Sequence, residues 1–186
     1  MKVDGQHFQS IWYDELDLSI RCIDQTKLPH DFVIIELDSL DAACHAIVSM
    51  QVRGAPLIGI TAAYGLYLAV KSDSTSYSNA RSALLKTRPT AVNLKWALDR
   101  MDAKCTGIDG EELAQIALAT ARDLEAQDRQ VCESIGENGA RVLKTLWESK
   151  ASAKPLNVLT HCNAGWLAAV DWGTALAVVY KAYELG

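Results

Sequence analysis

The hydrophobic pattern of the chain changes its period near residue 38. Before that point, short stretches are apolar or alternate between apolar and polar residues, which is typical of β-strands. They are Phe8 to Tyr13, Leu18 to Ile23 and Phe32 to Leu37. From Ser39 onward, apolar residues recur every three or four positions, which indicates helices. The pattern therefore predicts short strands followed by a helical region.

The helical region divides into segments of different character. The first helix follows Ser39, which is a plausible N-cap, and the second begins at Pro56. The uncharged run at residues 55–70 is shorter than the roughly 20 residues that a membrane span needs, so we expect a buried helix there. The later features are a polar connector at Lys71 to Ser78, a helix at Ala91 to Lys104, and a long amphipathic helix from Glu111 to about Trp147, eased by Gly136 and Gly139.

The carboxyl-terminal part carries a different pattern. Polar residues from Glu148 to Pro155 mark the expected domain linker. An apolar run, Leu156 to Leu159, then leads into a small-residue loop and a helix-like run from Gly173 to Tyr183. A strand, a loop and a helix in this order present a reactive group at the carboxyl end of a sheet. We expect an α/β chain, with a domain of short strands and helices at 1–150 and the opening βα unit of an incomplete sheet domain at 155–186.

Composition and charge narrow the functional classes. The chain has 186 residues and a net charge of −5, and it lacks a cluster of Lys or Arg, which argues against nucleic-acid binding. Its five cysteines, an odd number, show no metal-ligand spacing. Because no signal peptide opens the sequence, we expect reduced thiols in a cytoplasmic protein, with no metal site and no membrane contact.

Two arginines precede expected helix starts. Arg53 is followed by a glycine and then by Pro56, so fixed positive charge, unpaired N–H groups and close backbone approach coincide. Such an arrangement suits an anion such as a phosphate. Arg88 precedes a second helix start, with Thr90 as a possible N-cap. The alternatives are a tight helix–helix turn with a surface arginine at the first position and a plain capped helix at the second.

Cys162 is the sharper chemical candidate. A thiolate is stabilised by a helix amino terminus or a neighbouring cation, so a cysteine in the loop before a helix can be reactive near neutral pH. His161 precedes it, but adjacent residues of an extended segment point to opposite faces, so we expect no direct Cys–His pair. The alternative is a small buried thiol in a packing site rich in Gly and Ala. The remaining cysteines lie on apolar stripes and are expected in the core.

Three motifs occur in order along the chain. The first runs from Val52 to Gly65, the second from Arg88 to Met101, and the third from Leu159 to Gly165 together with Gly173 to Leu176. Together they resemble the 5-methylthioribose-1-phosphate isomerase family, whose superfamily includes ribose-1,5-bisphosphate isomerase and the regulatory subunits of the translation-initiation guanine-nucleotide exchange factor. The cysteine loop and the Arg-Pro-Thr-Ala-Val-Asn run favour the isomerase branch.

The resemblance implies a fold and a reaction. The family joins a mostly helical N-terminal domain to a larger Rossmann-like domain, so residues 155–186 would be the start of a truncated Rossmann-like domain. Its members convert 5-methylthioribose 1-phosphate, an aldose, to 5-methylthioribulose 1-phosphate, a ketose, in methionine salvage. They need no metal or organic cofactor and usually form homodimers. The implied partners are therefore a small-molecule sugar phosphate and a second copy of the chain.

The resemblance also implies roles for particular residues. Four residues would hold the substrate phosphate: Arg53, Gly54, Ala55 and Arg88. Cys162 would be the catalytic acid/base residue. The family pairs this cysteine with an aspartate that would lie beyond Gly186, so we expect the chain alone to be inactive. The alternatives are a catalytically dead remnant and an interaction subunit similar to those of the translation factor.

Overall fold

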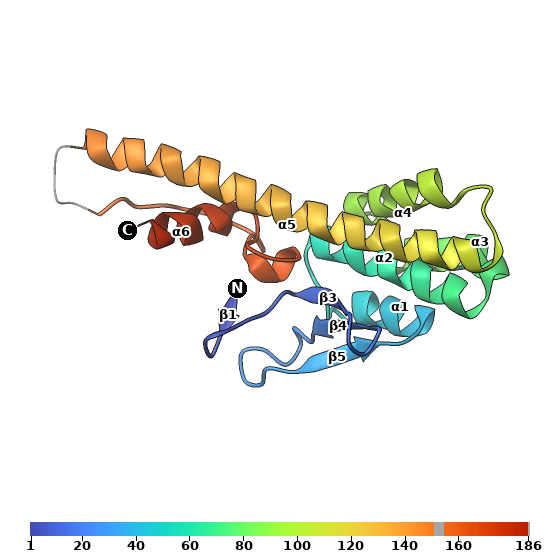
Figure 1. Cartoon of the computed structure of the whole chain (residues 1–186). Coiled ribbons are helices and arrows are strands. Elements are labelled where there is room, and N and C mark those ends of the chain that lie inside the picture. Colours follow the sequence, from blue (N-terminus) through green and yellow to red (C-terminus); the bar gives the residue numbers. More distant parts are fainter. Residues whose placement is uncertain (151–154, 186) are drawn as a thin grey trace.

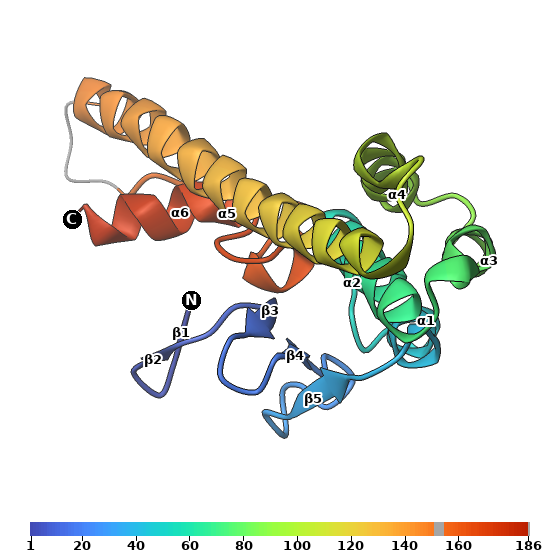
Figure 2. The ribbon, with the colours of Figure 1, turned by 45° about the vertical axis from the view of Figure 1, so that its right-hand side comes forward.

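The protein is dominated by helices and carries two small antiparallel sheets (Figure 1). The structure, a computed structural model, describes residues 1–150 and 155–185. Its longest element is α5, Gly110–Ser149, a helix of 40 residues. The helices α1 to α4 gather beside the amino-terminal half of α5, and α6 lies along its other half (Figures 1 and 2). The predicted mixture of strands and helices is confirmed.

The strands form where the alternating pattern predicts them. In the larger sheet, β3 (Ile11–Asp14), β4 (Ser19–Ile23) and β5 (Ile34–Leu37) pair antiparallel in that order. A second pair, β1 (Lys2–Val3) and β2 (Gln6–His7), was not predicted, because two-residue strands show no alternation. Their turn has positive φ at both central residues, an aspartate followed by a glycine, as tight hairpins require.

The buried helix predicted at residues 55–70 forms the centre of the core. Ser39 caps α1 (Leu40–Val48) as expected, because its Oγ accepts a hydrogen bond from the Ala42 N–H at 3.2 Å. The next helix, α2 (Ala55–Ser72), is buried at every position from 57 to 70. A helix that is apolar on all sides must be covered on all sides, and α1, α3, α4 and α5 all contact it.

Two details of the middle region differ from the prediction. The expected connector at Lys71 to Ser78 contains the end of α2, a 3-10 turn (Ser74–Ser76) and the start of α3 (Tyr77–Thr87). The pattern missed α3 because it buries few side chains. The next helix, α4 (Val92–Cys105), has Ala91 rather than Thr90 at its N-cap, because a turn closed by the Ala91 N–H on the Arg88 carbonyl moves the helix start.

The two glycines of α5 allow another helix to pack closely against α5. They do not serve to relax α5 itself, as the sequence pattern suggests. The last helix, α6 (Ala175–Glu184), packs against α5. A Cβ at Gly139 would lie 2.3 Å from Val178 Cγ2, and one at Gly136 would lie 2.9 Å from the Ala177 carbonyl oxygen. The long helix itself is confirmed. It extends to Ser149, so the first residues of the expected linker are helical, and residues 151–154 lie outside the described residues.

The strand predicted at Leu156 to Leu159 does not form. Residues 155–161 have no regular secondary structure, although the helix predicted after them is present as α6. A β-strand is stable only when a neighbour takes its backbone hydrogen bonds, and the described residues contain no strand that pairs with this segment. The Rossmann-like arrangement is therefore not formed by the described residues. No helix in residues 1–150 and 155–185 has both the length and the apolar character needed to cross a membrane.

Candidate functional site

The start of α2 lies directly against the turn that follows the cysteine loop. Gly54 is the N-cap of α2 and has a φ of 105°. A Cβ at this position would lie 2.4 Å from the Ala168 Cα, so only glycine permits the contact. Ala168 ends a 3-10 turn, η2 (Trp166–Ala168), which begins four residues after Cys162. The first motif therefore meets, at Gly54, the turn that lies between the two parts of the third motif, more than a hundred residues later in the sequence.

Side chains from the strand region fix the backbone of this turn. Ser10 Oγ donates to the Trp166 carbonyl at 3.0 Å, and Gln25 Nε2 donates to the Leu167 carbonyl at 2.7 Å. From α5, Asp128 Oδ2 accepts a hydrogen bond from the Val170 N–H at 2.7 Å. Burial raises the pKa of Asp128, while this hydrogen bond acts in the opposite direction. These polar groups hold the segment after Cys162 from two sides.

Sequence reasoning missed these supporting residues. Ser10 lies in an expected strand, Gln25 just after one and Asp128 in an expected helix, so their polar side chains look like surface positions. Ser10 is fully buried and Gln25 is 4% exposed. The only signal in the sequence was weak: a serine within an apolar run and a glutamine shortly after a buried strand.

Cys162 differs from the other cysteines of the chain. Its thiol is exposed and its backbone has a φ of 76°, whereas Cys22, Cys105 and Cys132 are buried. Burial raises the pKa of the Cys22 and Cys132 thiols to about 12, so these remain protonated in the core. The core location expected for the remaining cysteines is confirmed for Cys22, Cys105 and Cys132, whereas Cys44 is only half-buried. The alternative that Cys162 is a buried packing residue is wrong.

The cysteine loop is attached to the amino terminus of α6. The Ala164 carbonyl accepts hydrogen bonds from the Thr174 N–H at 3.0 Å and the Leu176 N–H at 3.2 Å. Gly173, with a φ of 79°, brings the two backbones together, since a Cβ there would lie 2.3 Å from the Gly165 carbonyl carbon. The positive end of the α6 dipole therefore faces the loop that carries Cys162.

The two candidate phosphate anchors are exposed arginines. Arg53 precedes α2 and Arg88 follows α3, and neither forms an ion pair with a carboxylate in the described residues. The segment after Arg88 reaches α2, because a Cβ at Gly59 would lie 2.8 Å from the Asn93 carbonyl oxygen. Within the described part of the chain, no hydrogen bond joins Arg53, Arg88 and Cys162 to one another. The backbone segments next to these three residues come together at α2.

Other residue groups offer less. Within residues 1–150 and 155–185, no group of three or more His, Cys, Asp or Glu side chains is arranged to hold a metal ion. A polar cavity lies between β3 and α5, and an apolar groove lies between the carboxyl-terminal half of α5 and α6. Neither is lined by the candidate site residues.

Over its whole length the chain is similar to curated proteins named methylthioribose-1-phosphate isomerase. The methylthioribose-1-phosphate isomerase of Methylocella silvestris is 50% identical over 188 residues, covering 100% of this chain and 51% of the relative. The protein of the same name from Escherichia coli is 45% identical, again over 100% of this chain and 51% of the relative. The chain spans about half the length of the curated relatives it matches.

Two solved structures share the fold. The translation initiation factor eIF-2B subunit delta from A. fulgidus has a TM-score of 0.80 and 36% identity, covering 97% of this chain and 52% of that one. The 5-methylthioribose 1-phosphate isomerase from Pyrococcus horikoshii has a TM-score of 0.77 and 30% identity, covering 95% and 50%. The family described as the initiation factor 2 subunit family matches residues 51–186, which include all three motifs. The chain belongs to the initiation factor 2 subunit family.

Proposed function

We propose that these residues form the phosphate-binding and cysteine-bearing part of a methylthioribose-1-phosphate isomerase. The observation that carries the proposal is the contact at Gly54, where the backbone that bears Arg53 meets the turn after Cys162. The curated relatives in the comparison support the same reading, since those described above are named methylthioribose-1-phosphate isomerase. The substrate class is an aldose 1-phosphate.

The proposed anchors act on the phosphate. Arg53 and Arg88 supply guanidinium groups that have no carboxylate partner in the described residues, and the N–H groups of Gly54 and Ala55 open α2. Guanidinium groups and helix amino termini both bind oxyanions. Holding the phosphate fixes the sugar carbons in place, and this binding energy lowers the entropic part of the barrier.

Cys162 acts as the proposed proton carrier. Conversion of an aldose 1-phosphate to a ketose 1-phosphate breaks the bond between C1 and the ring oxygen, which takes up a proton, and moves a hydrogen from C2 to C1. The C2 hydroxyl loses its proton and becomes a carbonyl. Such a transfer requires a group that takes and returns a proton near the working pH. An exposed thiol in a loop bound to the amino terminus of α6 can serve in this way. The proposal includes no metal or organic cofactor.

The direct test is substrate binding. Titration calorimetry with methylthioribose 1-phosphate should show that Arg53→Gln and Arg88→Gln each weaken binding about 10-fold or more, since a charged hydrogen bond contributes roughly 1.5–3 kcal/mol. Arg100→Gln, an exposed arginine elsewhere on α4, is the matched control. Cys162→Ser should bind normally. Unchanged affinity in both anchor variants would overturn the proposal.

Catalysis by these 186 residues alone is expected to be negligible. The resemblance assigns the second acid/base group to an aspartate beyond Gly186, and ring opening and carbonyl formation require proton transfer at the sugar oxygens as well as at the carbons. Turnover by the purified 186-residue polypeptide that disappears in Cys162→Ser would contradict this expectation. An interaction subunit, as the likeness to eIF-2B subunit delta allows, would instead leave methylthioribose 1-phosphate unbound in the calorimeter.

We also propose that the chain forms homo-oligomers. The groove between α5 and α6 is lined by Leu143, Trp147 and Tyr183 among others, and Trp147 and Tyr183 are 52% and 88% exposed. Large exposed apolar surfaces commonly mark interaction sites. Light scattering should give a mass above 20.3 kDa, and Trp147→Lys should reduce it toward the monomer. A parent protein that stays monomeric at high concentration would refute this proposal.

A further inference from the structure

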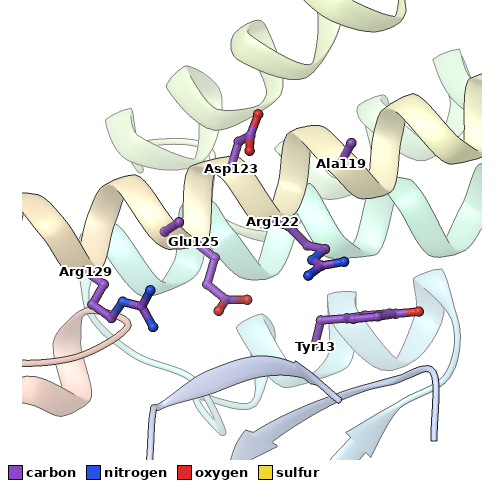
Figure 3. A pocket seen from close by; sticks show the side chains of 7 residues that line it. Tyr13, Ala119, Arg122, Asp123, Glu125 and Arg129 are labelled. Atoms are coloured by element: carbon purple, nitrogen blue, oxygen red, sulfur yellow. The ribbon is translucent and has the colours of Figure 1, made fainter. Parts of the chain in front are cut away.

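A polar cavity separate from the proposed substrate site lies between β3 and the middle of α5 (Figure 3). Its volume is about 460 Å³. It is lined by Tyr13, Ala119, Arg122, Asp123, Glu125, Ala126 and Arg129. Figure 3 shows Arg122, Glu125 and Arg129 reaching from α5 toward β3, while Asp123 points to the other side. The spacing of the three along α5 places them on one helical face.

The Glu125 carboxylate, at the centre of this cavity, accepts hydrogen bonds from other residues of the protein. The hydroxyl of Tyr64, a fully buried side chain, donates to Glu125 Oε2. With the Gln9 amide oriented to suit its neighbours, its nitrogen donates to Glu125 Oε1 at 3.3 Å and its oxygen accepts from Arg129 Nη1 at 2.8 Å. Glu125 is thus held in place without forming an ion pair with either arginine of the cavity.

The two arginines on either side retain most of their donors. Among the described residues, Arg129 has no carboxylate within ion-pair distance and gives one N–H to Gln9. Arg122 lies over the Tyr13 ring, 5.3 Å from its centroid, and pairs with Glu15 in an exposed ion pair. Exposed pairs of this kind contribute only about 0–1 kcal/mol, so a stronger anion can displace Glu15.

We infer that this cavity binds a small polyanion whose phosphate or carboxylate groups bridge Arg122 and Arg129. Seven residues of α-helix separate the two Cα atoms by about 10 Å along the axis, a span that two long side chains close around one ligand with two anionic groups. Guanidinium groups bind phosphate and carboxylate in a two-point fork, which a single surface lysine cannot reproduce.

Binding at this cavity would also stabilise the fold. A bridging ligand joins β3 to α5 through Tyr13 and the two arginines. Asp128, which holds the Val170 N–H, is the residue next to Arg129 on α5. A ligand that binds only the folded state raises stability in proportion to the logarithm of its concentration. The ligand would therefore strengthen the helix segment that supports the turn after Cys162.

The test uses pyrophosphate, inorganic phosphate and succinate as probes, with titration calorimetry at low ionic strength. We expect saturable pyrophosphate binding, weaker binding of phosphate, and a loss of at least 10-fold in the double variant Arg122→Gln, Arg129→Gln. Arg141→Gln, an exposed arginine further along α5, should bind as the parent does. Glu125→Gln should bind more tightly, because it removes a negative charge and keeps an oxygen for the Tyr64 hydroxyl. Succinate binding comparable to that of pyrophosphate would identify a carboxylate ligand instead of a phosphate.

Controls separate this site from the substrate site. Arg53→Gln and Arg88→Gln should leave pyrophosphate affinity at the cavity unchanged, whether or not these two arginines bind the isomerase substrate. Thermal unfolding without ligand should show that the double variant remains folded. The inference is overturned if the parent shows no saturable binding or if the double variant binds equally well. It is also overturned if sodium chloride at matched ionic strength raises the unfolding temperature of the parent as much as pyrophosphate does.

Discussion

At the residue scale, several positions of this protein require glycine because other atoms lie where a Cβ would be, and not only because of the backbone conformation. Gly54 has a φ of 105° and also faces the Ala168 backbone, whereas Gly107 has a φ of 83° and no neighbouring atom within 4 Å of the place a Cβ would occupy. The first combines conformational strain with a steric clash, and the second has only the strain. The pair separates the two effects experimentally.

Gly54→Ala should destabilise the protein more than Gly107→Ala. A positive φ costs a non-glycine residue roughly 1–2 kcal/mol, which is the whole effect expected at Gly107. At Gly54, overpacking against the Ala168 backbone adds about 1–3 kcal/mol. Urea unfolding measures both differences. Equal losses for the two variants would show that Gly54 does not contact the turn after Cys162.

At the element scale, the long helix α5 acts as the support for the rest of the chain. Its first half packs on α2 and α4, its centre carries the polar cavity, and its second half receives α6 (Figure 2). In proteins most helical stability comes from the packing of an amphipathic face rather than from intrinsic propensity, so burial of this face by its neighbours supplies most of the stability of α5. Glycine at 136 and 139 lets α6 approach closely.

Gly139→Ala should destabilise the protein, although the same change in an exposed helix normally stabilises by about 0.5–1 kcal/mol. The reversal follows because the new methyl group would overlap Val178, a β-branched side chain with little freedom to move. Asn138→Ala, the exposed neighbour on α5, is the matched control and should be neutral or stabilising. Chemical denaturation compares them, and stabilisation by Gly139→Ala would contradict the packing of α6 on α5.

At the scale of the whole molecule, hydrogen bonds from the strand region and from α5 connect the carboxyl-terminal segment to the rest. The side chains of Ser10, Gln25 and Asp128 each hold one backbone group of residues 166–170, and the Ser10 N–H also donates to the Val170 carbonyl at 2.8 Å. Asp128 is the acidic member of this set, and burial raises its pKa. A carboxyl whose pKa is raised on folding stabilises the protein most when protonated, and this stabilisation is lost as the pH rises through the folded-state pKa.

Asp128→Ala should cost roughly 1–3 kcal/mol, because the Val170 N–H loses its acceptor. Asp128→Asn keeps an oxygen acceptor and should cost much less. The free energy of unfolding of the parent relative to Asp128→Asn should be highest in acid and should fall as the pH rises above about 4, the ordinary pKa of an aspartate. Urea unfolding from pH 3 to 7 tests this, and a flat difference would contradict the burial of the carboxyl.

Local pattern was sufficient wherever a residue's partners are close in sequence. The strand alternation before Ser39, the cap at Ser39, the all-apolar run of α2 and the amphipathic stripe of α5 each express the period of one element, and each is present in the structure. The three motifs were also readable, because the resemblance rests on residue identity in order along the chain, and the family match agrees.

Tertiary structure alone decided what these segments touch. The glycines at 54, 136 and 139 read as turn or helix-easing residues, and only the approach of Ala168 and α6 shows why they lack a side chain. The run at Leu156 to Leu159 read as a strand, yet it has no strand to pair with among the described residues, and backbone pairing is a property of two segments. The cavity formed by Arg122, Glu125 and Arg129 arises only because β3 and Tyr64, distant in the chain, cover one face of α5.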